Sequence, residues 1–264
     1  MEEDIYFLRL FHPKMRLRVF LFWRYTMNSL LQSAAENLSF ILVCILIIAA
    51  LIILAALAQK FVCKALPKRK GAKYIVFVAM FSALAGVLML FEIPLFFAPG
   101  FYKLDLSEIP VLLCSFYMGP VAGVICEFIK VLIKLVLKNT TTAFVGDFAN
   151  FVVGCSFVLP ASIIYYIKKS KKTAIWGMVT GTAVMAIFGS IFNAVYLLPK
   201  FASLFGMPLE AIIAMGTEVN AAINSVSTLV LFAVVPFNIL KGVIVSIVTF
   251  LLYKRLEKLL LKNK

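Results

Sequence analysis

Hydrophobic positions along this chain run in long unbroken blocks and do not alternate with polar ones. The block from Phe40 to Ala58 carries no charge, and a helix needs about 20 such residues to cross the hydrocarbon core of a bilayer. Further apolar blocks follow, separated by short polar or basic stretches. Because lipid offers no hydrogen-bond partner to exposed backbone, these blocks are predicted to be transmembrane helices.

The block pattern predicts one helix over residues 39–63, a basic linker over 64–73, and six helices after the linker. Residues 201–228 are less apolar and are predicted to form a structured loop with a short amphipathic helix. The fold class is therefore an all-α polytopic membrane protein. It has an N-terminal extension, residues 1–65, with an extra transmembrane helix, and a six-helix membrane domain, residues 66–264. The six helices are predicted at 74–98, 111–118, 120–138, 144–167, 174–199 and 229–256.

Composition supports the membrane class and disfavours catalysis. Hydrophobic residues make up 63% of the chain, and the mean hydropathy is +1.04, well above the values of a soluble domain. The only histidine is His12, and the acidic residues are dispersed, so neither a metal centre nor an enzyme is predicted. The five cysteines stand singly, without CxxC spacing, and are interpreted as packing residues: Cys44, Cys63, Cys114, Cys126 and Cys155.

Lysine and arginine positions predict the orientation in the membrane. The linker 64–73, the run "KKSKK" at 168–172 and the tail 253–264 are dense in basic residues, and the predicted helices place all three on one side. The positive-inside rule makes that side the cytoplasm, with the C-terminus there. Topology and attraction to anionic lipid then account for most of the net charge of +14, and no nucleic-acid partner is expected. The basic stretch from Lys14 to Arg24 departs from this rule and indicates either an interfacial segment or a helix of poorly determined orientation.

Polar residues interrupt the last apolar block at "PFNILKG", residues 236–242. Polar groups within a membrane usually face a cavity, a partner or each other. Asn238 and Lys241 are three residues apart and share a helix face, so both could point at one ligand. The alternative is that Lys241 extends to the interface and Asn238 caps a helix broken at Pro236.

Two more charges lie within a predicted helix, at Glu127 and Lys130. Their spacing favours a partly neutralising pair inside the bundle. A proton relay is the alternative, and it would make the protein an ion-coupled secondary carrier, although no inverted repeat is apparent.

Three segments, in this order and separation, carry a family resemblance: "KLDLSEIPVLLCSFYMGPVAGVICEFIK", "VGDFANFVVG" and "PFNILKGVIVSIVTFLLYKRL". The chain resembles the riboflavin-specific S component (RibU-type) of energy-coupling factor (ECF) transporters over roughly residues 70 to 260. The N-terminal extension is a departure, because the six-helix core of the family does not require it.

The resemblance implies a high-affinity riboflavin-binding subunit of an ECF-type ABC vitamin importer in the cell membrane. Such a subunit holds riboflavin in an external pocket and associates with a transmembrane coupling subunit and two cytoplasmic ATPases. Riboflavin is then cargo, so no cofactor is expected. The chain has no GxxxxGK[ST] phosphate loop, so another polypeptide must supply any ATP-driven step. An ion-coupled secondary carrier for a flavin or another small heterocycle remains the alternative.

The resemblance also implies site residues. Asn238, Lys241 and Asn193 are expected to contact the isoalloxazine ring. A second group is expected to meet the ribityl chain: Lys103, Leu104, Asp105, Gly146 and Asn150. Phe97, Phe101 and Tyr196 are expected as apolar or aromatic walls. Ala79 and Ala83, four apart on the first core helix, are expected at the interface with the coupling subunit, because small residues let helices approach closely in lipid.

Overall fold

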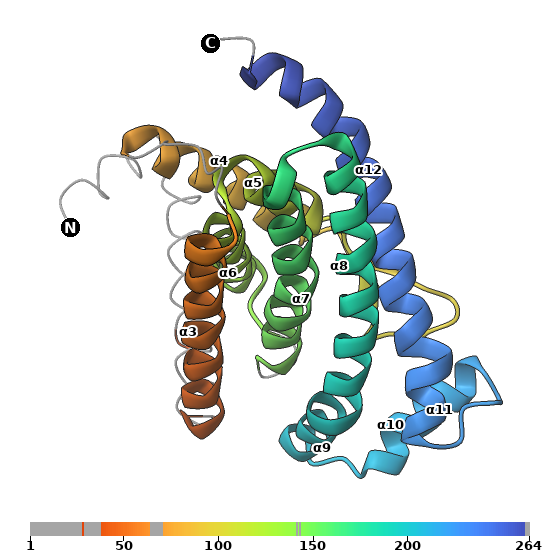
Figure 1. Cartoon of the computed structure of the whole chain (residues 1–264). Helices are drawn as coiled ribbons and strands as arrows, with labels where there is room; N and C mark the ends of the chain where they lie inside the picture. Colours follow the sequence, from red (N-terminus) through yellow and green to blue (C-terminus); the bar gives the residue numbers. More distant parts are fainter. Residues whose placement is uncertain (1–27, 29–37, 64–70, 141, 143, 262–264) are drawn as a thin grey trace, which may run out of the picture.

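The computed structural model describes residues 28, 38–63, 71–140, 142 and 144–261 of the chain. Long helices dominate this part (Figure 1). Two short π-helical segments continue α8 into α9 and α11 into α12: η1 (Asn193–Leu197) and η2 (Val230–Val234). The α-helices are α3 (Leu38–Phe61), α4 (Ala72–Leu88), α5 (Glu108–Met118), α6 (Pro120–Lys138), α7 (Val145–Lys168), α8 (Lys171–Phe192), α9 (Leu198–Phe205), α10 (Leu209–Val219), α11 (Val226–Leu229) and α12 (Val235–Leu261).

Within the described residues, four helical segments are long and apolar enough to cross a membrane: Phe40–Phe61, Val145–Lys168, Lys171–Phe205 and Val226–Tyr253. α4 and α5 are shorter apolar helices. α6 is long enough to span, but it carries Glu127, Lys130 and Lys134, and all three are buried inside the bundle. The protein is therefore a multi-pass membrane protein built on the predicted helices.

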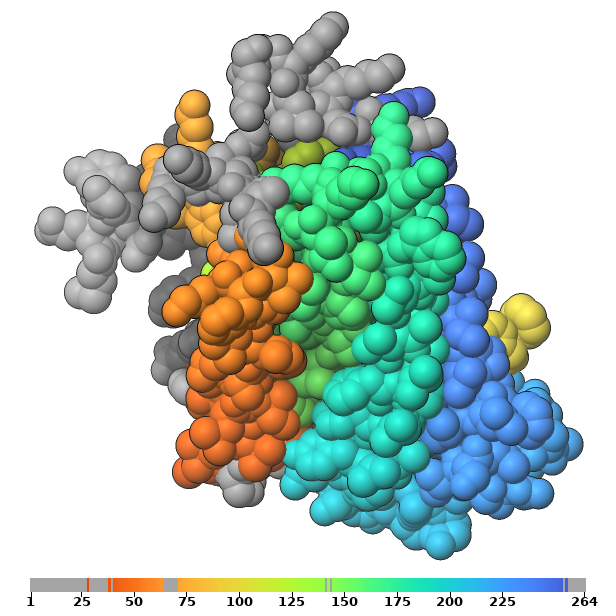
Figure 2. Space-filling view, viewed as in Figure 1, coloured from red at the N-terminus to blue at the C-terminus, as the bar shows by residue number. Residues whose placement is uncertain are grey.

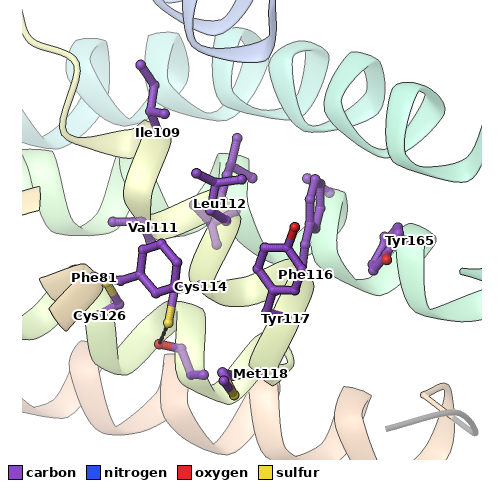
Figure 3. Close-up of a cluster of buried hydrophobic side chains, with 14 of the residues drawn as sticks. Phe81, Ile109, Val111, Leu112, Cys114, Phe116, Tyr117, Met118, Cys126 and Tyr165 are labelled. Atoms are coloured by element: carbon purple, nitrogen blue, oxygen red, sulfur yellow. Dashed lines mark hydrogen bonds between the residues drawn. The ribbon is translucent and has the colours of Figure 1, made fainter. Parts of the chain in front are cut away.

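α5 occupies the centre of the bundle, and every one of its residues is buried. Its sequence is apolar nearly all round, which is the pattern of a helix enclosed by others. Figure 3 shows its side chains packed with Phe81 of α4, Cys126 of α6 and Tyr165 of α7. The Cys114 thiol donates to the Ala122 carbonyl oxygen at 3.9 Å, so this cysteine packs as predicted.

Glycines let α7 and α8 pack closely side by side. A Cβ at Gly177 would lie 2.5 Å from the backbone oxygen of Ala161, and one at Gly181 would lie 2.6 Å from that of Phe157. Without a hydrophobic driving force between helices in lipid, such close backbone approach is a main source of helix association. α12 packs on the other side of α8.

α3, the extra helix that precedes the six in the sequence, packs against α6 and α7. Figure 2 shows it beside α7. Phe40, Cys44 and Ala55 face the bundle and are buried, whereas apolar side chains such as Leu46 face outward. A helix with apolar residues on all sides suits a position between protein and lipid. α3 is thus an additional apolar helix of membrane-spanning length.

The predicted helix 74–98 is too long at its end, because α4 stops at Leu88. Residues 89–107 instead form a loop with a two-stranded antiparallel sheet, in which β1 (Ile93–Pro94) pairs with β2 (Lys103–Leu104). Pro94 disfavours helix in its own neighbourhood. The prediction of helix up to residue 98 rested on the apolar block alone, and the hydrophobicity of a block does not show such a break. This loop runs beside α12 in Figure 1.

The helix ends that flank the basic clusters lie together at the upper end of Figure 1: the end of α3, the start of α4, the α7–α8 turn and the end of α12. Residues 64–70 and 262–264 of those clusters, and the basic stretch from Lys14 to Arg24, lie outside the described residues. The start of α7, the end of α8 and the start of α12 lie toward the opposite end. That the upper end faces the cytoplasm stays a prediction.

Candidate functional site

A cavity of about 130 Å³ lies among α7, α8, α12 and the loop before α5. Its walls come from the start of α7, the end of α8 with η1 and α9, and the start of α12. Aromatic and aliphatic side chains alternate there with a few amides and charges, as in sites that bind small molecules. The lining residues are Phe101, Tyr102, Lys103, Glu108, Thr142, Val145, Gly146, Ala149, Asn150, Val153, Gly154, Met185, Asn193, Leu197, Leu198, Phe201, Phe237, Asn238 and Lys241.

Lys241 is the buried cation of this cavity, with 5% of its surface exposed. Its Nζ lies 3.0 Å from Asp105 Oδ2 and 3.4 Å from Glu108 Oε1. The side chain therefore points into the bundle and does not extend to the interface. A buried charge is tolerated only when it is paired and hydrogen-bonded, and the two carboxylates meet that requirement.

The ion pairs continue from Glu108 into α6. Lys130 Nζ donates to Glu108 Oε1 at 2.8 Å and lies 2.7 Å from Glu127 Oε2. The predicted Glu127–Lys130 pair is thus confirmed, and it belongs to a larger buried network. This network links the cavity, through Glu108 and Lys241, to the centre of the membrane domain.

Asn238 is the second buried polar residue on the cavity side of α12, with 3% of its surface exposed. A Cβ at Gly189 of α8 would lie 2.9 Å from Asn238 Nδ2, so glycine at that position leaves room for the amide. Among the described residues, Nδ2 has no hydrogen-bond partner.

Asn193 enters the cavity from the other helix. It begins the π-helical segment η1, and its Nδ2 donates to the Gly189 carbonyl oxygen at 2.7 Å while its Oδ1 accepts from the Tyr102 hydroxyl at 2.9 Å. A π-helical turn adds a residue to the turn and re-aims the side chains that follow, and such turns are frequent at functional sites. Here the turn ends at Leu197 and is followed by Leu198, and both residues line the cavity.

The loop between α6 and α7 builds the wall beside Gly146. Thr142 Oγ1 accepts from the Gly146 backbone N–H at 3.0 Å, and Asn150 Nδ2 donates to the Gly146 carbonyl oxygen at 3.2 Å. Behind them, Lys134 Nζ donates to Asp147 Oδ1 at 2.5 Å and ties α6 to the first turn of α7. These bonds fix the end of the loop that leads into α7.

Lys103 lies on the exposed side of the cavity and is half-exposed. Its Nζ donates to Glu92 Oε2 at 3.1 Å, and Lys138 at the end of α6 donates to the same oxygen at 2.7 Å. Burial acts to raise the pKa of Glu92, but the bonds from Lys138 and Lys103 outweigh it and hold this pKa below its ordinary value. Glu92 therefore bridges the loop before α5 to α6.

The structure brings seven of the eleven residues expected at a binding site into the cavity wall, and six of them are polar residues or glycine: Lys103, Gly146, Asn150, Asn193, Asn238 and Lys241. Phe101, expected as an aromatic wall, lies there too. Asp105 lies behind the wall, paired with Lys241, and Leu104 is buried outside the lining. Phe97 packs on the cluster around Leu198, and Tyr196 stacks on Phe192 at 5.4 Å, so neither reaches the cavity.

Several lining residues were not anticipated from the sequence. Glu108 stands inside the quoted "KLDLSEIP" motif, so its acidic character next to Asp105 was a usable signal. Tyr102, Phe201 and Phe237 carried no signal, because nothing in a linear sequence separates them from the many other aromatic residues. Ala79 and Ala83 are not among the cavity residues; they lie on an outward face of α4, and both are exposed.

Comparisons with known proteins agree with this architecture. The family model of the ECF transporter substrate-specific component matches residues 73–253. The riboflavin transporter RibU of Staphylococcus aureus is 39% identical over 188 residues, which cover 71% of this chain and 92% of that protein. The riboflavin transporter FmnP of Bacillus subtilis is 32% identical over 186 residues, 70% of this chain and 92% of that protein.

A solved structure, described as the S component of a bacterial ECF transporter, superposes with a TM-score of 0.57 at 39% identity. It covers 71% of this chain and 97% of its own. The matched segment contains the whole cavity wall, from Phe101 to Lys241. On the family match and these relatives, the chain belongs to the substrate-specific components of ECF transporters.

Proposed function

We propose that this chain is the high-affinity riboflavin-binding subunit of an ECF-type ABC vitamin importer. The observation that carries the proposal is the cavity wall, in which Asn193, Asn238 and Lys241 converge from two helices within the segment that matches the family. The relatives that are named riboflavin transporters support the choice of vitamin.

The chemistry of the wall suits a flavin. Phe101, Phe201 and Phe237 offer flat apolar surface to an aromatic ring system. Amides offer both a donor and an acceptor, and lysine offers donors, so Asn238 and Lys241 can meet the polar edge of the isoalloxazine. Lys103, Gly146 and Asn150 lie toward the start of α7 and are assigned to the ribityl chain. Asp105 acts through Lys241, whose ammonium it holds.

Partners follow from the same proposal. The outward face of α4 that carries Ala79 and Ala83 docks the transmembrane coupling subunit, because small residues permit close helix contact. Two ATPases then act from the cytoplasm, where the basic helix ends and the C-terminus lie. Residues 1–65 form the N-terminal extension, and residues 66–264 form the substrate-binding membrane domain. The chain itself carries no catalytic role, and riboflavin is its cargo and not a cofactor.

The test is a direct binding measurement on the full chain in detergent. Protein purified from cells grown in ordinary medium should show the visible absorbance of a flavin, and protein freed of ligand should quench the fluorescence of added riboflavin at a stoichiometric end point. Thiamine, added in excess, should not displace the flavin. A colourless preparation that leaves riboflavin fluorescence unchanged would refute the proposal.

A further inference from the structure

Three polar groups in the cavity wall are not fully satisfied by the part of the chain that the structure describes. Asn238 Nδ2 and Glu108 Oε2 are buried there without a hydrogen-bond partner. Lys241 Nζ has two acceptors, Asp105 and Glu108, whereas an ammonium carries three N–H donors. Because buried polar groups in proteins are almost always hydrogen-bonded, unsatisfied ones that line a cavity point to a ligand.

These groups come from two helices that pack together. Asn238 and Lys241 are three residues apart on α12, and Glu108 is the first residue of α5, which packs against α12. Glu108 Oε1 lies 3.4 Å from Lys241 Nζ, so the carboxylate and the ammonium are neighbours. The wall therefore offers two donors and, from a carboxylate with 1% of its surface exposed, one acceptor.

A ligand that matches this set has two acceptors and one donor on one edge. A cyclic imide, with an N–H between two carbonyl groups, has that arrangement, and the pyrimidinedione edge of a flavin is a cyclic imide. We propose that Glu108 determines ligand specificity, with Oε2 accepting the imide N–H while Lys241 and Asn238 donate to the two carbonyl oxygens. This inference rests on the proposed function and identifies the residue that accepts the hydrogen bond from the single donor of the ring edge.

The ion pairs of Glu108 suit this role. Lys130 Nζ at 2.8 Å and Lys241 Nζ at 3.4 Å both approach Oε1 and fix the carboxylate, whereas Oε2 accepts from no donor among the described residues. A hydrogen bond to an ionised acceptor is roughly twice as strong as a neutral one, so it discriminates sharply against a ligand without the donor.

Glu127 supplies a matched control. It is a glutamate of the same buried network, 2.7 Å from Lys130, and it is not part of the cavity wall. Changing Glu108 or Glu127 to Gln replaces one carboxyl group of the network by an amide with little change of shape. Only Glu108→Gln also places an amide group where the ligand N–H needs a carboxylate.

The experiment compares riboflavin with N3-methylriboflavin, which lacks the imide N–H, by fluorescence titration of the full chain. Wild type and Glu127→Gln should bind riboflavin more tightly than the methyl analogue by about tenfold or more, the scale of one charged hydrogen bond. In Glu108→Gln this preference should fall to about threefold or less, a loss well beyond titration error.

Three results would overturn the inference: equal affinity of the wild type for both flavins, an unchanged preference in Glu108→Gln, or an equal loss of preference in Glu127→Gln. The first needs no variant, so it decides even where Glu108→Gln does not purify. Failure of the wild type to bind riboflavin at all refutes the proposed function instead, so the two failures are distinguishable.

Discussion

Replacing Lys241 with methionine tests the centre of the proposed site. Methionine keeps the length of the side chain and removes its charge and its donors. In the structure the lysine has two roles, because it faces the cavity and also holds Asp105 at 3.0 Å and Glu108 at 3.4 Å. The single variant therefore perturbs binding and stability together, and the two effects have to be separated.

The expected magnitudes differ for the two roles. A ligand hydrogen bond to a charged group contributes about 1.5 to 3 kcal/mol, so riboflavin affinity should fall by about tenfold to a hundredfold. Removing one partner of a buried ion pair destabilises a protein by about 3 to 5 kcal/mol, because the other charge stays buried without compensation. Lys241→Met should therefore also unfold at a lower temperature than the wild type.

A double variant, Asp105→Asn with Lys241→Met, separates the two. The network formally holds Lys130 and Lys241 against Asp105, Glu108 and Glu127, and removing one residue of each sign keeps its net charge unchanged. We expect this variant to recover thermal stability relative to Lys241→Met and to remain weak in riboflavin binding. Asp105→Asn alone should retain most of the affinity, because the ammonium still has Glu108 as a partner.

The measurements are fluorescence titration with riboflavin and a thermal melt of the ligand-free protein in the same detergent. If the double variant is stable and binds riboflavin as tightly as the wild type, Lys241 serves only the ion pairs and the ring edge has been assigned to the wrong helix.

Three further predictions address the partner face, the cavity wall and the transport class. Ala79→Leu or Ala83→Leu should leave riboflavin affinity within about twofold and strongly reduce ATP-dependent uptake in the assembled transporter, since bulky side chains prevent close helix approach; lost binding would contradict the interface assignment. Gly189→Ala should weaken riboflavin binding, because its Cβ would lie 2.9 Å from Asn238 Nδ2, whereas Gly100→Ala, with nothing within 4 Å, should bind normally; equal affinities would show that the amide is not needed. The chain alone in liposomes should bind riboflavin without accumulating it under a proton or sodium gradient, and substantial uptake would favour a secondary carrier.

The positions of most helices could be predicted from the sequence because lipid imposes a local rule. Each segment must satisfy its own backbone and remain apolar over the membrane thickness, and both requirements are visible in a continuous stretch of residues. The predicted 120–138 coincides with α6, and the predicted 144–167 differs from α7 by one residue at each end. Where the rule does not apply, as at residues 89–107, the prediction of helix to Ala98 was wrong.

The cavity could be predicted only in part, for a physical reason. Burying an amide or a charge within the membrane costs free energy unless the group faces a cavity or a polar partner. Asn238 and Lys241 therefore stood out in the sequence. The pairing of Lys241 with Glu108 and of Asn193 with Tyr102 could not be predicted, because each contact joins segments more than ninety residues apart. Such contacts depend on how helices pack, and the sequence records no distance between them.

The sequence by itself determined the membrane class, the helix order and the family, because hydrophobic blocks and motifs are properties of consecutive residues. Only the tertiary structure decided which charges pair and which polar atoms stay unsatisfied. Lys241 is held by Asp105 and Glu108 because α12 packs beside α5 and the loop before it. Tyr196 turns away from the cavity because its ring stacks on Phe192. The direction of a side chain depends on all the elements around it, and that information exists only once the helices have packed together.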